Sequence, residues 1–206
     1  APSSLTDTLA IRRMILPLSR LPLSSAFRSA TTAFRPSLFR HSLCEPPRHF
    51  ATTTMAKIAA GATLPDVKVK VGDEVKSIKD VFTDKGVLFA VPGAFTPTCS
   101  EKHLPGFVSK ASELAAKGVK TIACIAVNDP FVMKAWKKDV NVPDSVLMIS
   151  DGNGDFTKAI GMVLDASANY LGSRSNRYAM IIEPGAKVAW VGEGEDSFVD
   201  VVLSKL

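Results

Sequence analysis

Cys99 is the residue of this chain best placed to do chemistry. It follows residues 92–98 (PGAFTPT), a run of prolines, a glycine and hydroxyl side chains that is typical of a shaped turn. We expect Thr96 to be the N-cap of a helix and Pro97 its first residue, since proline lacks the N–H that would be unpaired there. Cys99 then lies in the first turn, where free N–H groups and the helix dipole favour thiolate over thiol. The alternative is a small buried core cysteine, as most free cysteines are.

The segments on either side of this turn predict the elements that hold Cys99. Residues 86–91 (GVLFAV) are apolar throughout, which is typical of a buried strand. After the turn, apolar residues recur at spacings of three and four, which predicts a helix to about Lys117 with a kink at Pro105. A cysteine at the turn from a central strand into a helix fits a thioredoxin-like arrangement.

The rest of the pattern predicts an α/β fold with a mixed central β-sheet flanked by helices. Strands alternate with helices first, and a hairpin then closes one edge. Further strands are expected at 67–71, 74–78, 119–127, 146–149, 178–183 and 187–191. Further helices are expected at 78–82, 130–140, 155–162 and 196–206, with a loop at 164–176.

Residues 1–54 differ in composition from the rest of the chain. They hold seven arginines, no lysine and two acidic residues, whereas 18 basic and 18 acidic residues follow. An extension rich in Arg, Ser and Thr and poor in acidic residues is typical of an organelle transit peptide. Arg48 lies three residues before Ala51, which resembles a mitochondrial processing site with cleavage before Ala51. We predict a mitochondrial-type transit peptide over 1–54 and one folded domain over 55–206. A disordered extension without an address is the alternative.

The same composition excludes several classes of protein. Because the basic excess is confined to residues 1–54, the predicted domain has no net charge, which argues against nucleic-acid binding. No apolar run reaches the roughly 18 residues of a membrane-spanning helix, so no membrane association is expected. Three cysteines are too few for a disulfide framework and suit a reducing compartment. No metal site is expected.

Residues 92–99 resemble the signature of the peroxiredoxins, in the form found in the type II (peroxiredoxin 5-like) branch. Further motifs match in family order at 103–107 (HLPGF), 127–136 (VNDPFVMKAW), 150–154 (SDGNG) and 172–178 (GSRSNRY). The resemblance extends from about residue 57 to the end of the chain. It implies a thioredoxin-like fold and a thiol-specific peroxidase that reduces hydrogen peroxide and alkyl hydroperoxides in antioxidant defence, without a metal or organic cofactor.

The resemblance also implies roles for individual residues. Cys99 matches the peroxidatic cysteine, whose thiolate attacks a peroxide oxygen and becomes a sulfenic acid. Thr96 matches the hydroxyl that hydrogen-bonds the substrate, and Pro92 the residue that shields the site from water. Arg174 matches the arginine that holds the thiolate and polarises the peroxide. Arg177 is the rival for this role, because guanidinium chemistry alone does not separate the two.

Two residues near this constellation have open interpretations. Cys124 matches the second cysteine of plant-type members, which makes it a candidate resolving cysteine, but its apolar strand also fits a core residue. His103, four residues after Cys99, lies on the same helix face and is expected to be a supporting or packing residue rather than part of a Cys–His hydrolase dyad.

The resemblance further implies partners. No cysteine follows Cys124, so the distal resolving cysteine of animal members is absent. This favours reduction of the sulfenate by an outside thiol, either glutathione with glutaredoxin or thioredoxin. A homodimer is also implied. The alternative function is a thioredoxin-like redox sensor or chaperone without efficient peroxidase turnover, which would also need a reactive Cys99.

The two ends of the chain resemble targeting signals for different compartments. The final tripeptide Ser204-Lys205-Leu206 matches a peroxisomal signal and equally fits the end of an amphipathic helix. A product that starts at Met55 would lack residues 1–54. We therefore expect a mitochondrial protein, with a cytosolic or peroxisomal form from the Met55 start.

Overall fold

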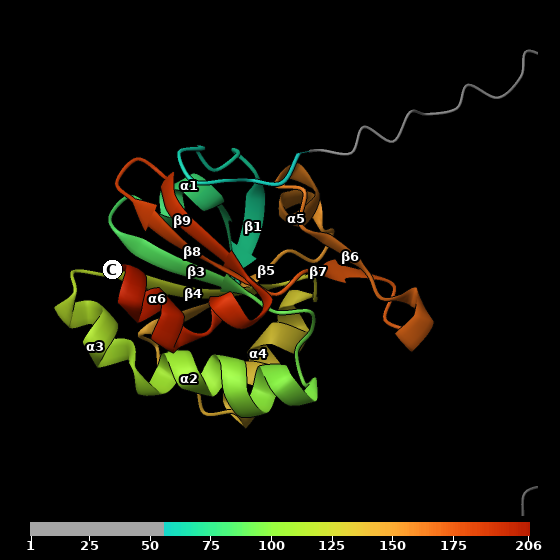
Figure 1. The fold of residues 1–206 in the computed structure, drawn as a ribbon. Coiled ribbons are helices and arrows are strands. Elements are labelled where there is room, and N and C mark those ends of the chain that lie inside the picture. Colours follow the sequence, from blue (N-terminus) through green and yellow to red (C-terminus); the bar gives the residue numbers. More distant parts are fainter. Residues whose placement is uncertain (1–55) are drawn as a thin grey trace, which may run out of the picture. The chain divides into compact units, whose positions relative to one another are not determined.

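The computed structural model describes residues 56–206, so the predicted transit peptide and Met55 lie outside the described residues. Residues 56–206 form a seven-stranded mixed sheet in the order β2-β1-β5-β4-β3-β8-β9 (Figure 1). Its centre is parallel and consists of β3 (Gly86–Ala90), β4 (Thr121–Ala126) and β5 (Val146–Ser150). Every residue of β3 is buried, as expected of a central strand with both faces covered. The predicted α/β fold with a mixed central sheet is confirmed.

Antiparallel strands extend this centre on both sides. β1 (Lys68–Val71) pairs with β5 and with the edge strand β2 (Glu74–Ser77). On the other side, β8 (Tyr178–Glu183) pairs with β3 and with β9 (Lys187–Glu193). The strands predicted from apolar runs and from alternation are therefore all present, with bounds shifted by a few residues.

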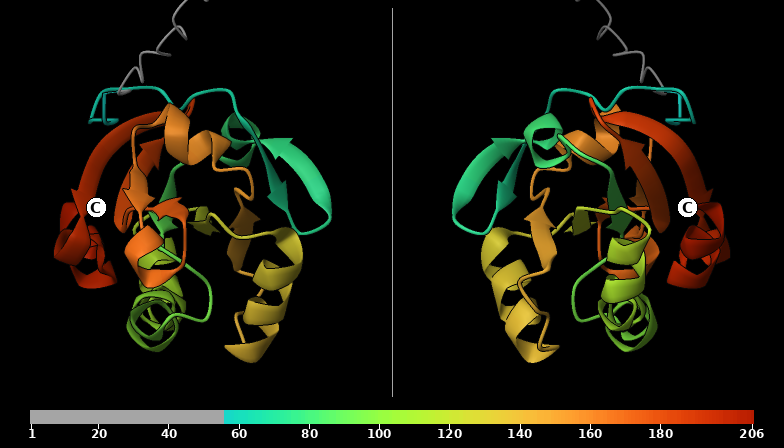
Figure 2. Two further views of the ribbon diagram at one scale, coloured as in Figure 1. Left: turned by 90° about the vertical axis from the view of Figure 1, so that its right-hand side faces the viewer. Right: turned by 90° about the vertical axis from the view of Figure 1, so that its left-hand side faces the viewer.

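Helices cover both faces of the sheet (Figure 2). One face carries α2 (Leu104–Ser109), α3 (Ala111–Ala116), α4 (Pro130–Asp139) and α6 (Val199–Lys205). The other face carries the short α1 (Ile78–Val81) and α5 (Asp155–Ala159). Each face has its own cluster of buried apolar side chains, and both Cys99 and Cys124 belong to the cluster under α2, α4 and α6. No helix within residues 56–206 is long and apolar enough to cross a membrane.

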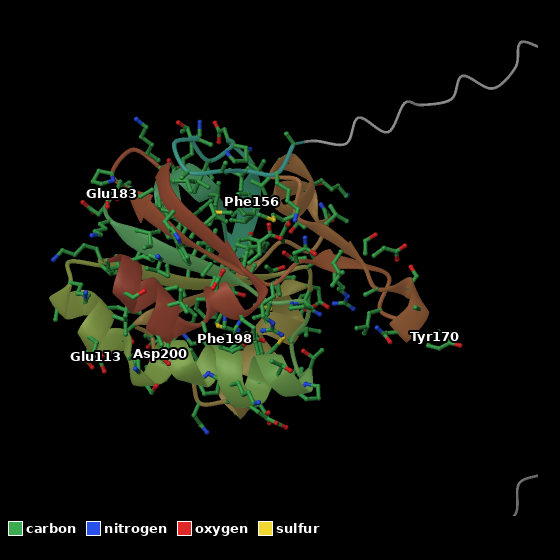
Figure 3. All side chains as sticks on the ribbon, in the orientation of Figure 1. Glu113, Phe156, Tyr170, Glu183, Phe198 and Asp200 are labelled. Carbon is green, nitrogen blue, oxygen red and sulfur yellow. The ribbon has the colours of Figure 1, made fainter. Side chains whose placement is uncertain are left out.

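A hairpin replaces the loop predicted at 164–176. It consists of β6 (Val163–Asp165) and β7 (Ser173–Ser175) and projects from the sheet (Figure 1). Tyr170 lies at its tip and is almost fully exposed (Figure 3). Each strand has only three residues, which is too short for an alternating pattern to be recognised in the sequence.

The helix after Cys99 is interrupted in a different way from the prediction. Pro97 and Thr98 are helical, residues Cys99–His103 form a π-helical turn (η1), and Lys110 separates α2 from α3. The Leu104 N–H donates to the Cys99 carbonyl across five residues instead of four. Pro105 has no N–H to continue the ladder, so it is accommodated directly after this wider turn. The helix is thus irregular close to the place where the kink was predicted, and the irregularity is a π-helical turn that ends before Pro105.

The last predicted helix is divided as well. A 3₁₀ turn, η3 (Gly194–Ser197), precedes α6, and Phe198 between them has an extended backbone. Leu203 and Leu206 pack against the core that contains Cys99. The chain end thus has the packing expected of an amphipathic helix, and the use of the final tripeptide as an address stays a prediction.

Candidate active site

The strand β3 leads directly to Cys99, as the sequence predicts. The chain leaves β3 at Ala90, and the Val91 N–H still donates to Ile125 of the neighbouring β4 (N–O 3.1 Å). A short turn follows, in which Phe95 has a positive φ of 60°, a conformation that stores strain in a residue with a large side chain. Cys99 then lies in the first helical turn, and its side chain is fully buried.

Thr96 and Pro97 occupy the predicted N-cap and first helical positions, and the Ser100 N–H donates to the Thr96 carbonyl (3.0 Å), but the Thr96 side chain does not cap the helix. Its hydroxyl instead donates to the carbonyl of Gly93 within the turn (Oγ1–O 2.9 Å). On the other side of the turn, the Ala94 N–H donates to Oδ1 of Asn128 (3.0 Å). A hydroxyl that donates its own proton keeps its lone pairs for another donor. Thr96 and Pro92 are both half-buried, so each side chain keeps an exposed part.

Arg177 is the cation that contacts the thiol. It follows β7, and its Nη2 donates to Cys99 Sγ at 3.2 Å while its Nη1 contacts Nδ1 of His103 at 2.8 Å. A guanidinium stays protonated throughout the physiological pH range. The guanidinium thus places a fixed positive charge and an N–H donor at the Cys99 sulfur.

Arg174, which the motif favours for this role, lies elsewhere, and the prediction is corrected. Its Nε donates to the carbonyl of Leu171 (2.8 Å) and its Nη1 to the carbonyl of Val127 (3.0 Å). The first bond lies within the β6–β7 hairpin, and the second connects the hairpin to the residue after β4.

His103 links Arg177 to the C-terminal part of the domain. Its Nε2 lies 3.0 Å from the carbonyl oxygen of Ser197. Burial lowers the pKa of His103 to about 4; the Ser197 hydrogen bond raises it and the Arg177 charge lowers it further. The imidazole is therefore neutral at neutral pH. The sequence places His103 near Cys99, but it does not reveal the partner, because Ser197 is far away in the chain.

This pKa predicts an acid sensitivity of the fold. Between the ordinary His103 value of 6.5 and about 4, the unfolded chain binds a proton that the folded chain does not. The free energy of unfolding should therefore fall as the pH falls through that window, by up to roughly 3 kcal/mol. Urea unfolding of the full chain at pH 7, 5.5 and 4.5 measures it. A His103→Asn variant should show a smaller fall, and equal falls in the two proteins would contradict the assignment.

Trp136 supports the cysteine turn from the neighbouring helix. Its Nε1 donates to Oγ of Ser100, the residue after Cys99, at 3.0 Å. The sequence indicates Trp136 only as part of the inner face of its helix. A tryptophan side chain can fill an apolar core and can also donate a hydrogen bond, and the sequence alone does not tell which of the two it does.

Cys124 lies in the centre of β4 and is fully buried. Its backbone neighbours are Phe89 in β3 and Met148 in β5. Burial raises the pKa of the Cys124 thiol well above its ordinary value of 9.0, and the nearby Cys99 raises it further. Within residues 56–206, both cysteines are free. The expected core position of Cys124 is thus observed, while its resolving role stays a prediction.

The fold and the site together define a thioredoxin-like protein with a buried cysteine held beside a cation. The redoxin family model matches residues 59–202. The chain is 45% identical over 202 residues to peroxiredoxin-2E, chloroplastic, from Arabidopsis thaliana, an alignment that covers 93% of this chain and 81% of that protein. It is 50% identical over 155 residues to peroxiredoxin-2E-2, chloroplastic, from Oryza sativa subsp. japonica, covering 70% and 69%.

Solved structures agree with these relatives. Reduced Prx3 from Vibrio vulnificus, in complex with H₂O₂, is 44% identical with a TM-score of 0.69, covering 72% of this chain and 99% of that one. Peroxiredoxin 5 from Alvinella pompejana is 41% identical with a TM-score of 0.67, covering 71% and 96%. The chain therefore belongs to the redoxin family, as a type II (peroxiredoxin 5-like) peroxiredoxin. It is a thiol-dependent peroxidase.

Proposed function

We propose that Cys99 is the residue that reacts with peroxide. The observation that carries this assignment is the 3.2 Å contact between Arg177 Nη2 and Cys99 Sγ at a buried helix start. The thiolate is the nucleophilic form of cysteine, and the guanidinium supplies a charged hydrogen-bond donor to the sulfur that would react. The related Prx3 of V. vulnificus has been solved with H₂O₂, which supports hydrogen peroxide as a substrate of this chain.

The proposed reaction transfers one oxygen to the sulfur. The Cys99 thiolate attacks the nearer peroxide oxygen, an S–O bond forms and the O–O bond breaks. The distal oxygen takes the proton of the attacked oxygen and leaves as water or an alcohol. The sulfur is oxidised by two electrons to a sulfenate, which takes a proton from water to become the sulfenic acid. Negative charge develops on the leaving oxygen, where the Arg177 guanidinium stabilises it.

Two further residues have roles in this proposal. The Thr96 hydroxyl donates its proton to the Gly93 carbonyl, so its oxygen is left to accept a hydrogen bond from the O–H of a peroxide. Pro92 is half-buried beside the same turn and limits the access of water. Arg174 has no part in the proposed reaction, because both of its hydrogen bonds go to backbone carbonyls.

We infer that an outside thiol reduces the sulfenic acid. This is supported by the complete burial of Cys124 and by the absence of a later cysteine in the sequence. Peroxide consumption by the full chain, measured with glutathione and glutaredoxin and separately with thioredoxin, tests the function. Sustained consumption is expected with at least one of them. A single fast turnover without sustained consumption would instead favour the redox sensor.

A Cys124→Ala variant tests the inferred role of Cys124. The variant should keep the wild-type rate of peroxide consumption with the better outside thiol. It should lose roughly 1–2 kcal/mol of unfolding free energy, because a buried atom is removed from a packed strand. Chemical denaturation and the peroxide assay measure the two effects. Loss of turnover in a folded variant would identify Cys124 as the resolving cysteine.

We propose a homodimer that uses the surface beside the site. Phe95 in the cysteine turn is 52% exposed and Phe131 at the start of α4 is 80% exposed. The Ala94–Asn128 hydrogen bond joins the segments that carry them. Exposed aromatic side chains are common at interfaces between proteins. Sedimentation of the full chain should give a dimer, and a Phe131→Glu variant should sediment as a monomer; a monomeric wild type would refute the proposal.

We propose that residues 1–54 direct the protein to an organelle. Their arginine-rich, acid-poor composition supports a transit peptide. The names of two relatives place those proteins in the chloroplast, so the plastid joins the mitochondrion as a candidate. Immunolocalisation of the untagged chain in cells that hold both organelles separates them, and removal of Leu206 tests the peroxisomal signal. A purely cytosolic full-length chain would contradict the proposal.

A further inference from the structure

We propose that His103 is a positioning residue that holds the Arg177 guanidinium against the Cys99 thiol. The proposal rests on the assignment of Cys99 as the reacting residue. Three contacts run in series: Ser197 O to His103 Nε2 at 3.0 Å, His103 Nδ1 to Arg177 Nη1 at 2.8 Å, and Arg177 Nη2 to Cys99 Sγ at 3.2 Å.

The chemistry of these groups fixes the direction of every hydrogen bond. A carbonyl oxygen only accepts, so His103 Nε2 carries the proton and donates to Ser197. A guanidinium only donates, so the bare Nδ1 accepts from Arg177. The neutral imidazole with its proton on Nε2 satisfies both partners. An imidazolium would turn an N–H towards the guanidinium and leave Arg177 without its acceptor.

The surroundings hold the imidazole in one orientation. The ring is buried and makes aromatic contacts with three phenylalanines, with centroid distances of 5.2 Å to Phe89, 5.6 Å to Phe107 and 5.0 Å to Phe198. These rings come from β3, α2 and the residue before α6. His103 itself ends the π-helical turn that begins at Cys99. Its Nδ1 is thus held at a fixed place relative to the sulfur.

The turn η3 supports both the backbone of Arg177, directly, and its side chain, through His103. The Gly194 N–H donates to the Arg177 backbone carbonyl (2.9 Å), while Ser197 orients the histidine that receives the side chain. Arginine is long and has several rotatable bonds, so the fork needs a second fixed partner to stay on the sulfur. The structure assigns that partner to His103.

Two substitutions separate positioning from packing. In His103→Asn, the amide Oδ1 can take the place of Nδ1 and accept from Arg177, but the bond to Ser197 is lost. In His103→Gln, the terminal amide can donate to Ser197, but the acceptor for Arg177 is lost. Asparagine is the smaller residue and leaves the larger cavity. If His103 only fills space, His103→Gln should be the milder change, because it leaves the smaller cavity. If His103 positions Arg177, His103→Asn should be the milder change, because it keeps the acceptor.

The readout is the rate at which iodoacetamide alkylates Cys99 in the full chain at pH 7, followed on the Cys99 peptide by mass spectrometry. Alkylation requires thiolate and needs no peroxide. We expect His103→Gln to slow it by about tenfold, the lower end of losses seen when an outer partner of a functional group is removed. His103→Asn should stay close to wild type. The rate constant for hydrogen peroxide should follow the same order.

Several results would overturn the proposal. Wild-type alkylation in both variants would do so, as would a greater loss in His103→Asn than in His103→Gln. Should neither variant fold, ¹⁵N NMR of the wild-type imidazole decides, because a proton on Nδ1 contradicts the assigned hydrogen bonds. Failure of the peroxidase assignment is recognised separately: wild type would then not react with peroxide at Cys99, while the alkylation rates would still report on His103.

Discussion

Replacing Cys99 with serine is expected to abolish peroxide reduction by the full chain. Serine has nearly the same shape, but its hydroxyl is not ionised at neutral pH and does not attack the O–O bond. The loss should be ~10³-fold or more, the scale on which removal of an essential nucleophile is measured. Peroxide consumption with glutathione and glutaredoxin, and with thioredoxin, gives the value.

The matched control is Cys124→Ala, which removes the other buried thiol of the same core. Urea unfolding of both variants shows that any loss of activity comes from the chemistry and not from the fold. The Cys99→Ser variant should remain folded, because the substitution changes a single atom. Retention of wild-type activity in this variant would place the reactive thiol elsewhere in the chain.

Replacing Arg177 with methionine should lower the rate constant for peroxide by about 10²-fold or more, as for other groups that stabilise developing charge. The reason is its direct contact with Cys99 Sγ. The same change at Arg174 should have a much smaller effect on the rate, because that side chain binds only the carbonyls of Leu171 and Val127. Stopped-flow oxidation of the reduced full chain measures both.

The Arg177→Lys variant separates charge from geometry. Lysine keeps the positive charge but does not provide the planar fork that reaches the sulfur and His103 together. Its rate should therefore lie between that of wild type and that of Arg177→Met. If Arg174→Met proves more damaging to the peroxide reaction than Arg177→Met, the assignment drawn from the sequence motif is restored.

The main sheet was predictable because its strands are marked by composition. The run 86–91 is apolar throughout and becomes the buried strand β3, while the alternating valines and lysines of β1 mark a strand nearer the edge. The β6–β7 hairpin was not predictable, because two three-residue strands have no period to detect. The π-helical turn at Cys99–His103 escaped notice for a similar reason, since it changes one hydrogen-bond spacing and leaves the apolar pattern intact.

The features of the site that depend on neighbouring residues were predictable, and those that depend on distant residues were not. The place of Cys99 at a helix start depends on its immediate neighbours and was predicted correctly. The choice between Arg174 and Arg177 depends on where β7 ends and how the chain then turns, which a motif does not contain. The role of Thr96 depends on a free carbonyl at Gly93. The partner of His103 lies 94 residues away at Ser197, beyond the reach of any local pattern.

The most direct test of Cys99 as the reacting residue is the reaction of the reduced full chain with one equivalent of hydrogen peroxide in the presence of dimedone, which traps sulfenic acids. Peptide mass spectrometry then locates the adduct. We predict rapid loss of the peroxide and an adduct on Cys99 that is strongly reduced in Arg177→Met. No adduct is expected on Cys124 or on Cys44, which lies within residues 1–54. An adduct on another cysteine, or no reaction of the wild-type chain with peroxide, would contradict this prediction.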